Sequence, residues 1–466
     1  MVDSKCTRDG RKNPPQEKKI AIVGAGPAGL TCANELILWG HDVTILEKED
    51  IPGGMMTLGI PKFRLPQEIT DFDLRSVLDL GITLKTETAL GVDYTVKELS
   101  ANYDAVIVAT GTMISFKLEV PGAEGKNVYP GLDFMMDLNK GKIKEVPEKV
   151  LVIGGGFTAV DCVRSSVRLG AKEVTLAYRR TQNEMQIDKH ELDSMELEGI
   201  KDMYLVSPIE VIRDEAGDVK AVKMIKNELG TPDESGRRRP VPIGGSEFTI
   251  ETDLLIPAIG QKAEVFAEIE TQKSQNVFFA GDFRTGPTSI IEAVADGKNV
   301  ANAAHTFLTG EKPQPAAIAF EPIKGPGTGR ERSDDFIEIQ EMPSLEREKR
   351  LKMDAEVLLG YDKDTAKLEG KRCYLCDHDY QIHIDRCIYC SACVEAMPRK
   401  CILLASDVEA EEDGSLHITE AENWEDVSAF VIDTPECIRC GECITACPVD
   451  CISVMRARPC DAWEER

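Results

Sequence analysis

Two stretches of the chain follow one pattern: an apolar run rich in β-branched residues, a glycine-rich turn, a helix-like stretch and a second apolar run. They cover residues 19–47, KIAIVGAGPAGLTCANELILWGHDVTILE, and residues 149–180, KVLVIGGGFTAVDCVRSSVRLGAKEVTLAYRR. A strand, a tight turn, a helix and a further strand in this order form a βαβ unit. The pattern therefore predicts two βαβ units, one early in the chain and one about 130 residues later.

The first turn carries the spacing of a dinucleotide-binding loop, with Gly24, Gly26 and Gly29. The first glycine permits the tight turn, the second lets the backbone approach a pyrophosphate, and the third lets helix and strand pack closely. The N-terminus of the helix offers unpaired N–H groups to the phosphates. Glu47 ends the second strand, where it is expected to accept hydrogen bonds from a ribose diol.

The second turn has Gly154 and Gly156, with Ala159 in the third position. Its second strand ends in Tyr178, where the first unit has Glu47, and Arg179 and Arg180 follow. Losing the acid and gaining two arginines favours a 2′-phosphate, and therefore NADP over NAD. The alternative is that both arginines are solvated charges at the end of a strand.

Two nucleotide units imply two nucleotides, a flavin that accepts hydride and a nicotinamide that supplies it. Residues 105–111 (AVIVATG) and 254–260 (LLIPAIG) are apolar strands ending in small-residue turns, as expected of segments that cross between two nucleotide domains. Residues 276–301 then predict a strand, a turn and a helix. We expect Gly111 to border the flavin site and Asp282 to hydrogen-bond the ribityl chain, although Gly-Asp is also a common plain turn.

Composition and charge limit the classes of partner that the protein is expected to bind. The formal net charge of −26 argues against nucleic acid, because phosphate binding needs clustered cations. No apolar run approaches the ~18 to 20 residues of a membrane span. Residues 1–17 have no apolar core typical of a secretory signal, and we expect a frayed arm. The sequence thus predicts a cytoplasmic protein with no membrane or nucleic-acid partner.

Twelve of the fifteen cysteines lie between residues 373 and 460. Without a secretory signal, metal binding is a better explanation for them than disulfides. Residues 437–448, CIRCGECITACP, carry the full 4Fe–4S ferredoxin spacing, with Cys437, Cys440, Cys443 and Cys447. In two-cluster ferredoxins the first three thiolates of such a run hold one cluster and the fourth serves the neighbouring cluster.

A shift of 50 residues places an earlier run, CIYCSACVEAMPRKC, on this motif without a gap. Cys387, Cys390 and Cys393 then match the first three cysteines of the later motif, but Met397 matches the fourth. The internal repeat predicts a pseudo-twofold ferredoxin domain with two 4Fe–4S clusters. Crossed ligation assigns Cys447 to the first cluster and leaves the second cluster without its fourth thiolate.

Three explanations stay open for the fourth ligand of this second, possibly atypical cluster. Cys401, one helical turn after Met397, is the nearest replacement and is the ligand that we predict. A three-iron cluster or an unusual ligand is an alternative, as is recruitment of Cys373 or Cys376. Cys451 occupies the same repeat position as Cys401 although its half already has Cys447, so a cysteine there is also compatible with simple packing.

The segments GAGPAGL, GGMMTLGIPKFRLP (53–66), GGGFTAVD and AGDFRTGPTSIIEA together resemble the glutamate synthase small-subunit family of flavin-dependent NADPH oxidoreductases. Its relatives include the large subunit of NADH-dependent ferredoxin:NADP oxidoreductase and the flavin/NADPH part of dihydropyrimidine dehydrogenase. The resemblance covers roughly residues 18–376. It implies an α/β fold with two Rossmann-like, glutathione-reductase-like nucleotide-binding domains, followed here by an α+β ferredoxin-like domain.

This resemblance also implies a domain plan. The FAD-binding domain is expected at 18–115 and 268–310, with the NAD(P)H-binding domain at 116–267 inserted between its parts. A connector follows at 311–372 and the ferredoxin-like domain at 373–466. The chain departs from the family in having only Cys6 before the first strand, where relatives carry a cysteine-rich domain, and in having Phe157 where Asn is common.

The parts predict an NAD(P)H:acceptor oxidoreductase subunit that moves electrons between NAD(P)H and ferredoxin or a larger enzyme, through FAD and two clusters. No acid–base catalytic residues are expected, because such a protein contributes positioning and potential tuning. Expected partners in a hetero-oligomer include a glutamate synthase large subunit, which this chain would feed with NADPH electrons, or a 2-oxoacid:ferredoxin oxidoreductase. A non-enzymatic electron-transfer or assembly subunit is the alternative.

Overall fold

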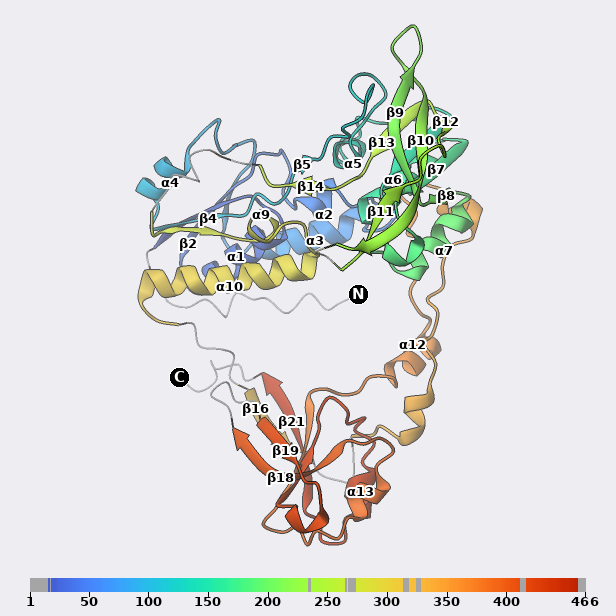
Figure 1. The fold of residues 1–466 in the computed structure, drawn as a ribbon. Coiled ribbons are helices and arrows are strands. Elements are labelled where there is room, and N and C mark those ends of the chain that lie inside the picture. Colours follow the sequence, from blue (N-terminus) through green and yellow to red (C-terminus); the bar gives the residue numbers. More distant parts are fainter. Residues whose placement is uncertain are drawn as a thin grey trace. The chain divides into compact units, whose positions relative to one another are not determined.

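The computed structural model describes residues 16, 18–233, 236–264, 266, 274–312, 318–323, 328–410 and 416–459. The chain forms two compact units (Figure 1). The flavoprotein unit comprises Met1–Pro313 with Leu345–Val357, and the ferredoxin unit comprises Gln314–Ser344 with Leu358–Arg466. Apart from Gln16, the predicted arm at 1–17 lies outside the described residues.

A five-stranded parallel sheet forms the first half of the flavoprotein unit, in the order β15-β4-β1-β2-β3. Its strands are β1 (Lys19–Val23), β2 (Asp42–Leu46), β3 (Thr83–Lys85), β4 (Ala105–Val108) and β15 (Val277–Phe279). The apolar run of β1 is buried on both faces, as a parallel sheet between helices requires. Strand β15 returns from late in the chain to pair with β4, so this sheet is discontinuous in sequence.

Helices cover this sheet closely because their contact residues are small. Helix α1 (Pro27–Leu38) packs against α10 (Ile290–Thr309), and a Cβ on Gly297 of α10 would lie 2.7 Å from the Ala28 carbonyl oxygen. Figure 1 shows α10 running beside the sheet. The other helices of this half are α2 (Met55–Leu58), α3 (Gln67–Leu78), α4 (Val96–Asn102) and α9 (Asp282–Thr285).

A four-stranded parallel sheet in the order β13-β6-β7-β8 forms the second half. Its strands are β6 (Lys149–Ile153), β7 (Glu173–Tyr178), β8 (Lys201–Tyr204) and β13 (Leu254–Pro257), and its helices are α5 (Gly131–Asn139), α6 (Phe157–Arg168), α7 (Lys189–Glu198) and the 3-10 turn η2 (Gln182–Glu184). This second βαβ unit repeats the first, which confirms the predicted α/β fold with two Rossmann-like units.

Antiparallel strands complete the flavoprotein unit. A ribbon of β9 (Val206–Arg213), β10 (Val219–Pro232), β11 (Arg238–Pro242) and β12 (Phe248–Glu251) extends from the second sheet (Figure 1). The two chain crossings between the halves pair with each other, as β5 (Ile114–Ser115) and β14 (Gln261–Lys262). The paired crossings line the same cavity as both glycine turns.

The ferredoxin unit has the twofold repeat that the sequence predicts. Helices α13 (Ala392–Ala396) and α14 (Glu442–Ala446) are 50 residues apart. The Asp433 amide donates to the Cys401 carbonyl at 2.9 Å, and the His383 amide donates to the Cys451 carbonyl at 2.8 Å. The shift of 50 residues places His383 on Asp433 and Cys401 on Cys451, so the two bonds are equivalent. Each half therefore contributes a strand to a sheet of the other half.

Two three-stranded antiparallel sheets frame these helices, in the orders β16-β21-β17 and β19-β18-β20. Their strands are β16 (Ile318–Pro322), β17 (His378–Ile382), β18 (Ile402–Ala410), β19 (Leu416–Glu420), β20 (Ala429–Ile432) and β21 (Ile452–Pro459). The remaining elements are η3 (Arg332–Phe336), α11 (Arg347–Arg350), α12 (Lys363–Gly370) and η4 (Trp424–Asp426). Thus β16, from the predicted connector, belongs to the ferredoxin unit.

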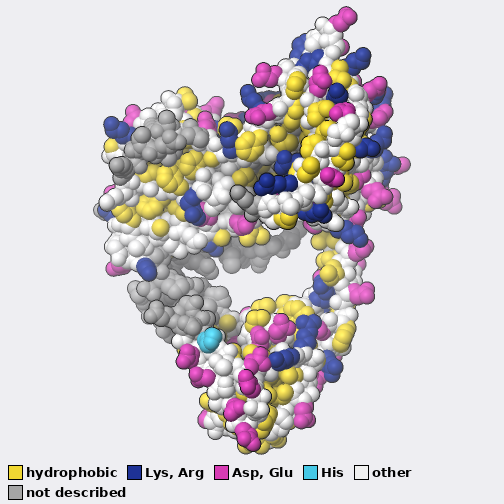
Figure 2. All heavy atoms as spheres, viewed as in Figure 1, with side chains coloured by type: hydrophobic (Ala, Val, Ile, Leu, Met, Phe, Trp, Pro, Cys, Tyr) yellow, Lys and Arg dark blue, Asp and Glu magenta, His cyan; other side chains and the backbone are white. Residues whose placement is uncertain are grey.

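Acidic side chains are spread over the visible face of each unit (Figure 2), in keeping with the net charge of −26. Within the described residues, no helix is both long and apolar enough to cross a membrane.

Candidate functional site: two glycine turns on one cavity and a two-motif cysteine centre

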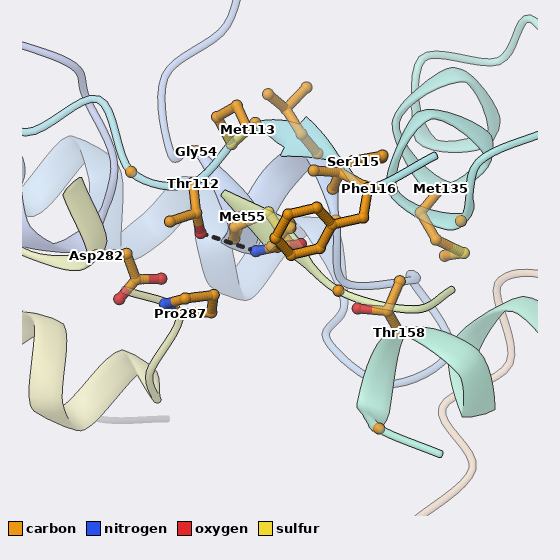
Figure 3. A pocket seen from close by; sticks show the side chains of 18 of the residues that line it. Gly54, Met55, Thr112, Met113, Ser115, Phe116, Met135, Thr158, Asp282 and Pro287 are labelled. Atoms are coloured by element: carbon orange, nitrogen blue, oxygen red, sulfur yellow. Dashed lines mark hydrogen bonds between the residues drawn. The ribbon is translucent and has the colours of Figure 1, made fainter. Parts of the chain in front are cut away.

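One cavity of about 1710 Å³ collects the predicted nucleotide-binding residues of the flavoprotein unit. Both glycine turns line it, together with the crossing segments and the start of α10. In Figure 3, Thr112 and Asp282 lie on one side of the cavity and Thr158 on the other, with Phe116 between them. A cavity of this size is large enough for extended, two-part ligands.

The first turn needs glycine at each position for a different reason. At Gly24, φ is +104° and a Cβ would lie 2.5 Å from the Ala109 carbonyl oxygen, while a Cβ on Gly29 would lie 2.0 Å from the Gly24 oxygen. Gly26 instead opens onto the cavity, its nearest Cβ neighbour being 3.9 Å away. The outer two glycines therefore permit close packing, and the middle one leaves room for a ligand.

Helices α1 and α6 both begin at this cavity without a side-chain cap and without an acid in the first turn. Their first N–H groups and positive dipole ends face the space where a phosphate fits. In the second turn, a Cβ on Gly156 would meet nothing within 4 Å, whereas one on Gly154 would lie 2.3 Å from the Ala258 oxygen. Ala159 is fully buried against Gly154, so its small side chain serves close packing.

Glu47 stands at the end of β2 beside the first glycine turn, as the sequence predicts. Its carboxylate accepts hydrogen bonds from the Ala25 amide at 2.7 Å and from the Glu49 amide at 2.9 Å. Burial raises the pKa of Glu47, and these two amides oppose the shift. The side chain is thus held in one position at the cavity wall.

Gly111 and Asp282 border the same cavity from different segments. Gly111 has φ +66° and nothing within 4 Å of a Cβ, and the neighbouring Thr112 hydroxyl accepts from the Gln261 amide at 3.0 Å (Figure 3). Asp282 Oδ1 accepts from the Thr288 hydroxyl at 2.7 Å, and burial raises the pKa of Asp282. Asp282 Oδ2 has no such bond among the described residues.

The structure separates the two predicted phosphate ligands. Arg179 is exposed and lines the cavity. Arg180 is 4% exposed, and its guanidinium donates to Asp233 and to the Arg238 carbonyl, each at 2.7 Å. Both arginines thus line the cavity, but Arg180 fixes the β10–β11 ribbon against β7, while Arg179 is exposed there. Arg237 also lines this part of the cavity, which the sequence analysis missed.

The sequence analysis likewise missed a largely buried charge network that begins at the cavity wall, where Arg64 and Asp161 line the cavity. Arg64, from the 53–66 segment, pairs with Asp161 on α6 at 2.8 Å and with Glu191 on α7. Glu198 on α7 accepts hydrogen bonds from Arg164 and Arg168, and Arg350 forms an ion pair with it at 3.2 Å. Burial raises the pKa of Asp161 to about 6, although the charge of Arg64 opposes the shift. The network ties the first half of the unit to the helices of the second.

Seven cysteines of the ferredoxin unit gather in one partly buried core with Met397, and they are Cys387, Cys393, Cys401, Cys437, Cys443, Cys447 and Cys451. The Cys401 side chain lies against Cys437 in this core, and their interaction raises the pKa of Cys401 and lowers that of Cys437. In the other half Cys451 contacts Cys387, and its Sγ lies 3.4 Å from the Cys447 Sγ. Each half thus delivers its late cysteines to the motif of the other half, as crossed ligation requires.

Met397 occupies in its half the position that Cys447 occupies in the other half. Its Sδ accepts the Cys401 amide at 3.4 Å, as the Cys447 Sγ accepts the Cys451 amide at 3.4 Å. Soft thiolates suit iron–sulfur centres, so this donor set fits the expected clusters except at Met397. Cys373 and Cys376 are exposed, and Cys6 and Cys460 lie outside the described residues.

Among the described residues, no three His, Cys, Asp or Glu side chains converge on a single-ion site. The prediction that this unit holds iron–sulfur clusters therefore rests on the cysteine spacing and on the contacts between cysteines of the two halves.

A fold with two dinucleotide turns on one cavity, joined in one chain to an iron–sulfur motif, defines a flavin- and nicotinamide-dependent oxidoreductase. The family model of pyridine nucleotide-disulphide oxidoreductases matches residues 18–297, and the model of the 4Fe-4S binding domain matches residues 430–453. The chain belongs to the pyridine nucleotide-disulphide oxidoreductase family.

Several named proteins are similar to this chain. The NADP(+)-dependent formate dehydrogenase subunit beta of Moorella thermoacetica is 36% identical over 77% of this chain and 54% of that protein. The NADPH-Fe(3+) oxidoreductase subunit beta of Geobacter sulfurreducens is 42% identical over 54% of this chain and 38% of its own length. The glutamate synthase [NADPH] small chain of Escherichia coli is 33% identical over 62% of this chain and 69% of its own.

These matches confirm the predicted resemblance to the glutamate synthase small-subunit family. The chain spans only 54% and 38% of the first two relatives. A solved structure, Mycobacterium tuberculosis FprA in complex with NADPH, covers 63% of this chain and 85% of its own with a TM-score of 0.53 and 20% identity. That similarity supports the fold alone.

Proposed function

We propose that this chain moves electrons between NADPH and a ferredoxin or partner oxidoreductase through FAD and two 4Fe–4S clusters. The observation that carries the proposal is the single cavity lined by both glycine turns, because a flavin and a nicotinamide must meet for hydride transfer. When bound, the flavin converts the two-electron nicotinamide donor into one-electron steps, which suits iron–sulfur acceptors.

In this proposal FAD binds the domain formed by residues 18–115 and 268–310. The Gly24–Gly29 turn receives its pyrophosphate, Glu47 its adenosine ribose, and Gly111 and Asp282 border the rest of the molecule. NADPH binds the domain formed by residues 116–267. The uncapped start of α6 behind Gly156 receives its pyrophosphate, and exposed Arg179 receives its 2′-phosphate. Arg180 supports that site from behind through Asp233.

The clusters are assigned by crossed ligation. Cys387, Cys390, Cys393 and Cys447 hold cluster one, and Cys437, Cys440, Cys443 and Cys401 hold cluster two. The contact between Cys401 and Cys437 supports Cys401 as the eighth thiolate, because a thioether such as Met397 is a poor ligand for these irons.

The relatives named as subunits support a hetero-oligomer, in which this chain serves a larger catalytic subunit as the electron-exchanging component. A glutamate synthase large subunit, a 2-oxoacid:ferredoxin oxidoreductase or a formate dehydrogenase would each match this role. The protein acts in the cytoplasm in this proposal.

Purification from the native host tests the proposal, with flavin, iron and sulfide counted per chain and co-purifying proteins identified. We expect one FAD, about eight irons and a partner oxidoreductase subunit. NADPH should bleach the flavin of the isolated chain and reduce a dye. Absence of flavin reduction by both NADPH and NADH would instead favour a non-enzymatic electron-transfer or assembly subunit.

A further inference from the structure

Arg439 lies inside the intact cysteine motif, two residues after Cys437 and one before Cys440. It is 4% exposed and has a left-handed backbone with φ +55°. Its counterpart under the 50-residue repeat is Tyr389, which has φ +52°. The two halves therefore place different side chains at one backbone position beside their cysteines.

Within the part of the chain that the structure describes, the Arg439 guanidinium bonds to backbone carbonyls and to no side chain. Its guanidinium donates to the Cys437 carbonyl and, at 3.4 Å, to the His378 carbonyl. Within the described residues, no carboxylate lies within ion-pair distance of it. A buried guanidinium without a counter-charge is strongly unfavourable.

The other buried arginines of the described chain show that this is an exception. Each of them has a carboxylate partner, and they are Arg164, Arg168, Arg180, Arg330 and Arg350. Arg330 also donates to the Ile438 carbonyl of the same cysteine loop, at 2.6 Å, but its charge is offset by Asp335. Arg439 therefore lacks a counter-charge that the fold supplies to every comparable residue.

The cysteines around Arg439 supply that counter-charge once they hold iron and sulfide as thiolates. The bond from the Arg439 guanidinium to the Cys437 carbonyl places its positive charge beside the first cysteine of the motif, whereas Asp379, on β17, carries the opposite charge. Asp379 is only half-buried and accepts a hydrogen bond from Gln381, so solvent screens it more than it screens Arg439.

The other half of the repeat carries no such charge. Tyr389 is neutral, donates to the Ser428 carbonyl at 2.6 Å and packs edge-on against Phe430. The arginine beside that motif, Arg386, is exposed. Among the described residues, the two cysteine motifs thus differ by one buried positive charge that has no carboxylate partner.

We propose that Arg439 is the buried counter-charge of the cluster held by Cys437, Cys440 and Cys443, and that it raises the reduction potential of this cluster above that of the other. The inference rests on the proposed function, because it requires bound clusters. A reduced cluster carries one more negative charge than an oxidised one, so a nearby fixed cation stabilises the reduced form.

The consequence is an order of electron occupancy within the ferredoxin unit. When one electron reaches the two clusters, it resides on the cluster beside Arg439, which is reduced while the other stays oxidised. The transfer between them moves one electron and no proton. The cluster beside Tyr389 is then the stronger reductant of the two.

The test is an EPR-monitored redox titration of the full chain carrying Arg439→Gln, with a Cys440→Ala variant to identify which signal belongs to this cluster. We expect that signal to titrate at a lower potential, with at least about tenfold less reduced cluster at a fixed potential, while iron and sulfide stay at the wild-type amount. The other cluster should keep its midpoint. Arg386→Gln, which removes an exposed arginine beside the other motif, should shift neither midpoint comparably.

Arg439→Lys separates charge from folding. If Arg439→Gln fails to assemble the cluster while Arg439→Lys assembles it near the wild-type potential, the counter-charge is supported. Full assembly of Arg439→Gln with an unchanged midpoint, or loss of the cluster in both variants, would overturn the inference. A count of about four irons in the wild type would contradict the two-cluster proposal, and the Arg439 shift would still be measurable on the remaining cluster.

Discussion

Arg179 and Arg180 show how neighbouring identical residues take different roles. Arg179 is exposed at the cavity, and Arg180 is buried in an ion pair with Asp233. We predict that Arg179→Gln raises the KM for NADPH about tenfold to a hundredfold, because a charge-assisted bond to phosphate contributes about 1.5–3 kcal/mol. The KM for NADH should hardly change, and steady-state dye reduction measures both.

Arg180→Gln is the matched control for this measurement. It breaks a buried ion pair, so we expect a lower unfolding temperature, with the ratio of the KM values for NADPH and NADH nearly unchanged. Equal effects of Arg179→Gln on NADPH and NADH would contradict the assignment of the 2′-phosphate to Arg179.

Cys401 and Cys451 occupy equivalent positions, but the residue four positions earlier differs: Cys451 has Cys447, at 3.4 Å between sulfurs, and Cys401 has Met397. We predict that Cys401→Ser lowers the iron count from about eight to about seven or fewer, with the EPR signal of a three-iron cluster or loss of cluster two. Cys451→Ser should keep about eight irons, because Cys447 remains. Two intact cubic clusters in Cys401→Ser would exclude Cys401 as a ligand.

At the scale of elements, each strand–turn–helix unit depends on glycines that let neighbouring backbone segments come close together. Gly24→Ala places a Cβ 2.5 Å from the Ala109 oxygen at a φ of +104°, so we predict loss of thermal stability and of bound flavin. Gly26→Ala meets no atom closer than 3.9 Å and should leave the unfolding temperature of the flavin-free protein nearly unchanged while it weakens flavin binding. Thermal unfolding and flavin content distinguish the two outcomes.

The packing of α6 and α7 depends on Glu198, which is 1% exposed and faces Arg164, Arg168 and Arg350. We predict that Glu198→Gln destabilises the flavoprotein unit by about 3–5 kcal/mol, because it leaves buried guanidinium groups without their counter-charge. Denaturant unfolding measures the change. Glu148→Gln, at an exposed pair with Lys172, should cost less than about 1 kcal/mol.

Glu198 also predicts a pH dependence of the stability of the flavoprotein unit. Its ion pairs and hydrogen bonds hold the pKa of Glu198 below its ordinary value of 4.5, although burial opposes them. Its stabilising contribution is therefore complete above about pH 4.5 and is lost as the pH falls through the lowered pKa. Glu198→Gln should lack this part of the acid destabilisation of the wild type.

At the scale of the whole molecule, the net charge of −26 predicts how partners approach. Residues 405–436 contain eleven acidic residues and no lysine or arginine, and this segment includes β19 and β20. Raising ionic strength from about 0.01 to about 0.15 M shortens the Debye length from about 30 to about 8 Å. We predict that electron transfer to a basic acceptor protein then slows severalfold, whereas reduction of a neutral dye does not.

The sequence by itself determined the two βαβ units, the cavity-facing glycines and the crossed cysteine repeat. Each of these follows from local rules: the periodicity of apolar residues, the need for glycine where backbones touch, and a fixed spacing of thiolates. The acid-to-arginine change at the second strand predicted a phosphate ligand, and Arg179 lines the cavity, but its role stays a prediction.

Only the tertiary structure decided which role each of several chemically similar residues has. It buried Arg180 against Asp233, brought Arg64 from a distant loop onto α6 and α7, and gave Arg439 no carboxylate partner among the described residues. Sequence could not reveal these roles, because burial and counter-charge depend on residues far apart in the chain. The cost of an unpaired charge arises only once folding has removed water from it.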